Sequence, residues 1–97
     1  MKKCRWTFLT NHGRVFAYVA KYPQTTTRQI ASKVGITERA VQKVIKDLVS
    51  DGYIVLRKAG RNNNYEVNPD LPMRHPLEKD YSVTNLLNAL GCDVDSQ

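Results

Sequence analysis

The spacing of apolar residues predicts a first helix from residue 10 to residue 22. Val15, Val19 and Tyr22 recur at i, i+4 and i+7, which places them on one face of a helix. Thr10 precedes the pattern as a candidate N-cap, and Pro23 ends it because proline cannot continue a helix. We therefore expect an amphipathic helix whose apolar face contributes to a core.

Two further helices are predicted after a brief polar edge strand at 24–27. The second covers 27–34 with Ile30, Ala31 and Val34 on one face, and Gly35 follows where helices commonly end in a left-handed conformation. Thr37 is placed to cap the third helix, about 38–51. Its apolar residues form one continuous stripe, which predicts burial. These residues are Ala40, Val41, Val44, Ile45, Leu48 and Val49.

The spacing changes to that of β-structure after residue 52. Residues 53–58 predict a strand, 60–64 a turn and 65–67 a second strand, which gives a hairpin with a cationic, amide-rich tip. Residues 69–76 contain three prolines and predict an extended connection. A last short helix is expected at about 83–90, with Gly91 at its end. Its apolar positions are Val83, Leu86, Leu87 and Leu90.

These elements predict a mainly α fold with a small β-hairpin. The expected division is an N-terminal arm at 1–9, one domain at 10–68, and a proline-rich connection, short helix and tail at 69–97. In the arm, Trp6, Phe8 and Leu9 are expected to be buried against the core, and Tyr18 and Tyr22 are expected to be core residues.

Charge is distributed unevenly along the 97 residues. Residues 1–67 carry 13 Lys or Arg against 4 Asp or Glu, whereas residues 68–97 carry 2 against 5. A basic domain of this size attracts polyanions, and nucleic acid is the usual one because neutralised phosphates release counterions. One small domain also has little room for a catalytic cleft, so we expect a binding module and not an enzyme.

Cysteine and histidine are too scattered to predict a metal site. Cys4 and Cys92 have no second cysteine at ligand spacing, and His12 and His75 are also isolated, with His12 expected to be simply exposed. We expect no cofactor, no metal, no membrane segment and no small-molecule ligand. Two unpaired cysteines without a secretory signal favour the cytoplasm, where a DNA-binding protein would associate with the nucleoid.

The stretch "RQIASKVGITERAVQKVIKDLVSDGYI" and the following "RKAGRNNNYEV" resemble the winged helix-turn-helix transcriptional regulators of prokaryotes, in the broad class of MarR-like and arsenic-repressor-like proteins. The resemblance covers residues 10–68. It implies binding to double-stranded DNA, usually as a two-fold dimer. The third helix would then lie in the major groove, and the wing, which is the hairpin containing "RKAGRNNNYEV", would lie on flanking backbone or minor groove. The long helices that build MarR-like dimers and the paired cysteines of arsenic sensors are absent from the sequence.

The polar face of the third helix supplies candidates for base contacts. A recognition helix presents its N-terminal turns to base edges. Arg39 can give a guanine two parallel hydrogen bonds and Gln42 can do the same for adenine, while Lys46, one turn further on, suits a phosphate. The alternative is an ordinary solvated face. The candidates in this helix are Thr37, Glu38, Arg39, Gln42, Lys43 and Lys46.

Two other segments are candidate DNA contacts. Thr26, Thr27 and Arg28 open the second helix, where backbone N–H groups and a hydroxyl can bind a phosphate, although a simple helix cap explains them equally well. The wing offers cations and amides without acids, and its alternative is plain turn chemistry. Its candidates are Lys58, Arg61, Asn62, Asn63 and Asn64, with Arg61 the first choice for a minor-groove or phosphate contact.

Three alternatives stay open from the residues alone. Val83, Leu86, Leu87 and Leu90 could form a dimer seam or pack on the chain's own core. The domain could be a winged helix that binds a protein in a transcription or processing assembly. It could also sense metal or redox state through Cys4 or Cys92. We expect a sequence-specific DNA-binding regulator.

Overall fold

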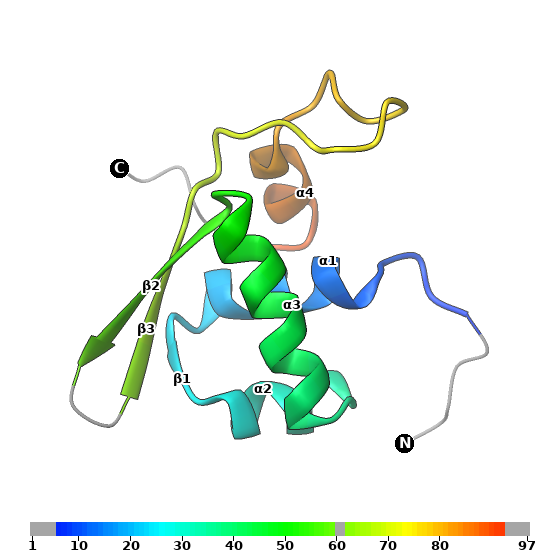
Figure 1. Ribbon diagram of the computed structural model, residues 1–97. Helices are drawn as coiled ribbons and strands as arrows, with labels where there is room; N and C mark the ends of the chain where they lie inside the picture. Colours follow the sequence, from blue (N-terminus) through cyan, green and yellow to red (C-terminus); the bar gives the residue numbers. More distant parts are fainter. Residues whose placement is uncertain (1–5, 60–61, 93–97) are drawn as a thin grey trace.

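The computed structural model describes residues 6–59 and 62–92 of the chain. Three helices pack against one another, a hairpin projects to one side, and a fourth helix lies beyond the end of the third (Figure 1). The predicted mainly α fold with a small β-structure is confirmed. The elements in chain order are α1 (Asn11–Lys21), β1 (Gln24–Thr25), α2 (Thr27–Val34), α3 (Glu38–Ser50), β2 (Ile54–Ala59), β3 (Asn62–Val67) and α4 (Val83–Ala89).

Threonine side chains cap the N-termini of the first three helices. The hydroxyl of Thr10 accepts a hydrogen bond from the Gly13 backbone N–H at 3.1 Å. The hydroxyl of Thr37 does the same for Ala40 at 3.0 Å, so both predicted caps are confirmed. Such caps satisfy N–H groups that have no partner within the helix. Each helix start is therefore fixed by short-range sequence.

The turn between α2 and α3 depends on a glycine. Gly35 has φ +89°, a left-handed conformation that a Cβ atom disfavours. Its N–H and that of Ile36 both donate to the Ala31 carbonyl, at 2.8 and 3.1 Å, which closes the end of α2. The predicted left-handed end is confirmed. As a result, only three residues separate the end of α2 from the start of α3.

The core lies between the helices and the base of the sheet. On α3, Val41, Val44 and Ile45 are buried as predicted, whereas Val49 at the end of the stripe is exposed. The largest fully buried side chains are Val15, Val19, Ile30, Val41, Ile54, Tyr65 and Leu87. Tyr22 is 50% exposed, so its predicted place in the core is wrong. The reason is that α1 ends at Lys21, and the Tyr22 ring packs on the Tyr18 ring at a centroid distance of 4.9 Å. Tyr18 itself is half-buried at the edge of the core.

The N-terminal arm does not pack on the core as predicted. Trp6 is 69% exposed and Phe8 is 92% exposed, and their rings meet edge to face at 5.0 Å. Leu9 is half-buried. The physical reason is that the apolar face of α1 is already covered by α2, α3 and β3, which leaves no large apolar surface for the arm.

The sheet has three antiparallel strands in the order β1-β3-β2. The predicted edge strand is confirmed, but residues 62–64, expected in the turn, belong to the central strand. Asn63 pairs with Thr25 on β1 and with Lys58 on β2. Asn64 likewise pairs with Gln24 on β1 and with Arg57 on β2. Asparagine is depleted in strands. Here pairing with two neighbours overrides that preference, which short-range sequence does not reveal.

Helix α4 completes the core of the same chain. Val83 and Leu87 are buried, Leu86 is half-buried, and Leu90 is 41% exposed. The connection from β3 is tied to α4 by a bond from the Val83 N–H to the Leu71 carbonyl at 2.9 Å. Packing on the chain's own core is thus confirmed for Val83 and Leu87. Their side chains are not available to a dimer seam, which would have to use Leu86 and Leu90.

Candidate nucleic-acid interface

One face of α3 carries the predicted base-contacting side chains into solvent. Val41, Val44 and Ile45 anchor the opposite face, so the intervening polar residues point away from the core. Within the described residues, none of the five forms a side-chain hydrogen bond or ion pair. A ligand can therefore engage them without breaking an existing contact. The exposed residues of this face are Glu38, Arg39, Gln42, Lys43 and Lys46.

Three of the five residues of this face are cationic. Arg39, Lys43 and Lys46 follow one another at i, i+4 and i+7, so their charges line one side of α3. Gln42 lies between the first two and Glu38 is at the N-terminus. This arrangement provides a bidentate donor, an amide that both donates and accepts, and two ammonium groups, which suits the edges and phosphates of duplex DNA.

The threonines at the helix starts serve as caps. Thr37 is exposed, but its hydroxyl is engaged with the Ala40 N–H. Thr26 forms a capping box with Gln29: its hydroxyl accepts from the Gln29 N–H, and the Gln29 side chain accepts from the Thr26 N–H, both at 3.1 Å. The cap interpretation of Thr26 is thus confirmed. Thr27 is half-buried and Arg28 is exposed at the start of α2.

The wing differs from its predicted form. Lys58 is exposed on β2, whereas Arg61 lies outside the described residues. Asn62 opens β3, and the Asn63 amide donates to the Tyr65 hydroxyl at 3.2 Å, so this amide is turned toward the sheet. Asn64 is half-buried. The asparagines therefore belong chiefly to the sheet, and the described cations of the wing come from β2.

Arg57 is a second wing cation that sequence analysis did not single out. It is exposed on β2, and its Nε lies 3.4 Å from Oε1 of Glu66 on β3. Both side chains are more than half exposed, so the pair is weak. The sequence places Arg57 in the predicted strand at 53–58, but only the pairing of β2 with β3 shows that it lies beside Glu66.

The candidate segments face one side of the molecule. In Figure 1, the start of α2, the start of α3 and the free end of the β2–β3 hairpin all point toward the lower part of the view. The starts of α2 and α3 and the hairpin end thus lie toward the same side of the molecule. Cations on separate elements that face one polyanion add their electrostatic attraction to it.

Residues 9–55 match the model of a family described as winged helix-turn-helix DNA-binding. The match covers just under half of the chain, from the residue before Thr10 to the start of β2, and so includes α2, the Gly35 turn and all of α3. The fold is a winged helix-turn-helix. No curated protein matches the chain. The family match supports DNA binding as the general role of this winged helix-turn-helix domain.

The described part of the domain offers neither a cluster of metal ligands nor a membrane-spanning helix. Among residues 6–59 and 62–92, no group of three or more His, Cys, Asp and Glu side chains could hold a metal ion. None of the helices described is long and apolar enough to cross a membrane. Cys92 is buried, with its Sγ 3.6 Å from the Ala17 carbonyl oxygen, and Cys4 lies outside the described residues.

His12 and Asp47 form a contact that sequence analysis missed. The Nε2 of His12 lies 2.9 Å from Oδ2 of Asp47, on the polar side of α3. The pKa of the Asp47 carboxyl is lowered, chiefly by this hydrogen bond; desolvation opposes the shift, and the nearby charges of Lys43, His12 and Lys46 each add a smaller lowering. His12 is exposed as expected, but it is not free. No local sequence signal relates two residues so far apart in the chain.

Proposed function

We propose that the protein is a sequence-specific regulator of transcription that binds double-stranded DNA in the cytoplasm, at the nucleoid. Helix α3 would lie in the major groove, with the wing against the flanking backbone or minor groove. The family match supports DNA binding in general, and the prokaryotic MarR-like and arsenic-repressor-like resemblance supports a regulatory role. The protein has no catalytic part in this proposal.

The observation that carries the proposal is the uncommitted polar face of α3. Arg39 and Gln42 lie in the first two turns of α3, where both are exposed and have no side-chain partner among the described residues. The turn that precedes α3 contains Gly35 in a left-handed conformation. The N-terminal turns of a recognition helix are the part that reaches base edges. We assign base contacts to Arg39 and Gln42, with Glu38 and Lys43 beside them.

Phosphate contacts are assigned to the flanking cations. Lys46 lies one turn beyond the base-contacting residues, Arg28 stands at the start of α2, and Lys58 and Arg57 stand on the wing. Contacts of this kind position a protein on the duplex and carry no sequence information directly. Arg61 and the asparagines at 62–64 remain candidates for the tip of the wing.

The experiment that tests this function is selection of bound duplexes from a random pool at physiological salt. A two-fold dimer would enrich a palindrome with half-sites about 10 base pairs apart. A monomer would enrich one unpaired half-site, which would support base recognition and contradict the dimer. A pool that binds no better after selection than before it would contradict sequence-specific DNA binding. The Arg39→Ala variant, carried through the same selection, is the matched control.

A further inference from the structure

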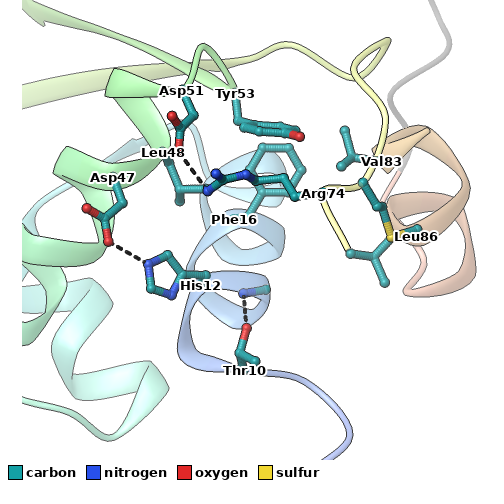
Figure 2. A pocket seen from close by; sticks show the side chains of 12 residues that line it. Thr10, His12, Phe16, Asp47, Leu48, Asp51, Tyr53, Arg74, Val83 and Leu86 are labelled. Carbon is teal, nitrogen blue, oxygen red and sulfur yellow. Dashed lines mark hydrogen bonds and ion pairs between the residues drawn. The ribbon is translucent and has the colours of Figure 1, made fainter. Parts of the chain in front are cut away.

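A cavity of about 350 Å³ opens between α1, the C-terminal part of α3, the connection that follows β3, and α4 (Figure 2). Pockets of this size suit small organic molecules. Its walls are largely apolar and come from segments far apart in the chain, so the cavity exists only when α4 is docked. The apolar lining residues are Phe16, Leu48, Tyr53, Met73, Val83 and Leu86.

Two ion pairs stand at the polar side of this cavity. His12 on α1 meets Asp47, and Nη1 of Arg74 on the connection meets Oδ2 of Asp51, each at 2.9 Å. Asp47 and Asp51 are four residues apart at the end of α3, so their carboxylates lie one above the other. Figure 2 shows both acids on the α3 side, with the partners reaching them from other elements.

We propose that this cavity binds a small organic cation, a primary ammonium group carried on an apolar or aromatic body. An ionised carboxylate can accept about four hydrogen bonds. Asp47 and Asp51 each accept one side-chain bond within the described residues, so both retain acceptors for an ammonium group. An anionic ligand would instead have to displace two carboxylates from their partners and remain beside them.

The balance of charge in the lining favours a cation. The lining holds two carboxylates, Asp47 and Asp51, and one guanidinium, that of Arg74, in a protein whose overall charge is +6. The carboxylates sit on short side chains at the end of a rigid helix, whereas Arg74 is a long and largely exposed side chain on an irregular connection. Arg74 can therefore swing aside for a ligand while the acids keep their positions.

Aromatic rings give the body of such a ligand a fitting surface. Phe16 and Tyr53 line the cavity with their rings at 88° to one another and 6.2 Å between centroids. The Tyr53 hydroxyl is fixed by a hydrogen bond to the Pro72 carbonyl, which holds the ring in place. Ring faces attract cations as well as apolar groups.

The proposed site joins α3 to the segment that follows the wing. Because Asp47 and Leu48 belong to α3, Asp51 is its C-cap and Arg74 lies on the connection, a bound cation would contact both segments and replace the Arg74–Asp51 contact. A ligand alters DNA affinity only by the difference in its affinity for the two states of the protein. Such an effector role rests on the proposed function. The binding itself does not, and it is tested without DNA.

The test is calorimetric titration of the full chain with two probes that share one aromatic body, 2-(1-naphthyl)ethylammonium and 1-naphthylacetate. We expect saturable binding of one ammonium per chain, about tenfold tighter than any binding of the carboxylate, a difference that two exposed charge contacts can supply. The overall positive charge of the protein favours the anion, so the comparison is a demanding one. Equal binding of both probes, or tighter binding of the carboxylate, would overturn the proposal.

Variants locate the binding. Asp47→Asn and Asp51→Asn should each weaken ammonium binding by about threefold to fivefold, as expected for one half-exposed charge contact. Asp80→Asn, in an exposed loop outside the cavity, removes the same charge and should leave binding unchanged. Arg74→Met should strengthen ammonium binding, because it removes a competing cation. Unchanged binding in both acid variants, or weaker binding in Arg74→Met, would contradict the assignment, provided that thermal melts show folded protein.

Discussion

His12 on α1 and Asp47 on α3 are joined by a 2.9 Å contact between Nε2 and Oδ2, across 35 residues of sequence. The contact ties the first helix to the polar side of α3, four residues beyond Lys43. It also keeps the Asp47 carboxyl ionised to lower pH than usual by lowering its pKa. The same acid thus contributes to folding and lines the cavity proposed as a cation site.

Acid stability should depend on Asp47. A carboxyl whose folded pKa is lowered stabilises the fold above its ordinary pKa of about 3.9, and this contribution is lost as the pH falls through the lowered value. Asp47→Asn should therefore melt below the wild type at pH 5 and converge with it near pH 2. Circular dichroism melts over this range measure the effect. A constant difference at every pH would contradict it, and Asp80→Asn should follow the wild type throughout.

Loss of a base contact and loss of a phosphate contact should have different effects on DNA affinity. Arg39→Ala should lose about 1 to 3 kcal/mol for the preferred duplex and little for random duplex, because a bidentate contact discriminates between bases. Lys58→Ala should weaken binding to both and lower the salt slope by about 0.9, as one phosphate contact does. Fluorescence anisotropy at several salt concentrations measures both. An Arg39→Ala variant that lost equal affinity for the two duplexes would refute its base-contacting role.

Helix α4 should be part of the folding unit. Leu87 is fully buried, so Leu87→Ala should lower the free energy of unfolding by about 2 to 5 kcal/mol. Leu90 lies one turn on but is 41% exposed, and Leu90→Ala should cost less than about 1 kcal/mol. Urea denaturation of the two variants gives the comparison. Equal small losses would mean that α4 is not docked in solution.

Two glycines should respond oppositely to alanine. Gly35→Ala places a Cβ in the left-handed conformation at the α2–α3 turn and should cost about 1 to 2 kcal/mol. Gly13 lies inside α1, where an added Cβ would make ordinary contacts of 3.5 Å or more with Leu9 and Thr10. Gly13→Ala should therefore stabilise by about 0.4 to 1 kcal/mol. Thermal melts distinguish the two signs, and stabilisation by Gly35→Ala would disprove the role given to that turn.

The features that could be predicted from sequence are those fixed by residues near one another. The caps at Thr10 and Thr37 each bond to an N–H three residues on, and Gly35 closes its own helix. The buried stripe of α3 follows from the helical period alone. The exposed candidate face of α3 could be predicted for the same reason, since it is what remains opposite the stripe.

The rest depends on contacts between distant segments. Asn63 is part of the central strand because β1 pairs with it from 38 positions earlier in the chain, against the preference of asparagine for turns. Trp6 and Phe8 are exposed because other elements have already covered α1. The pairs at Asp47 and Asp51, which line the cavity, join residues brought together only by folding.

The bond from the Cys92 thiol to the Ala17 carbonyl has a consequence for how the chain acquires its structure during translation. Because α1 leaves the ribosome before the segment around Cys92, the contact of Ala17 with that segment forms only after α2, α3 and the sheet have been synthesised. Helices α2 and α3 can form and pack in the meantime. Docking of α4 is then the closing event, and it creates the cavity as it occurs.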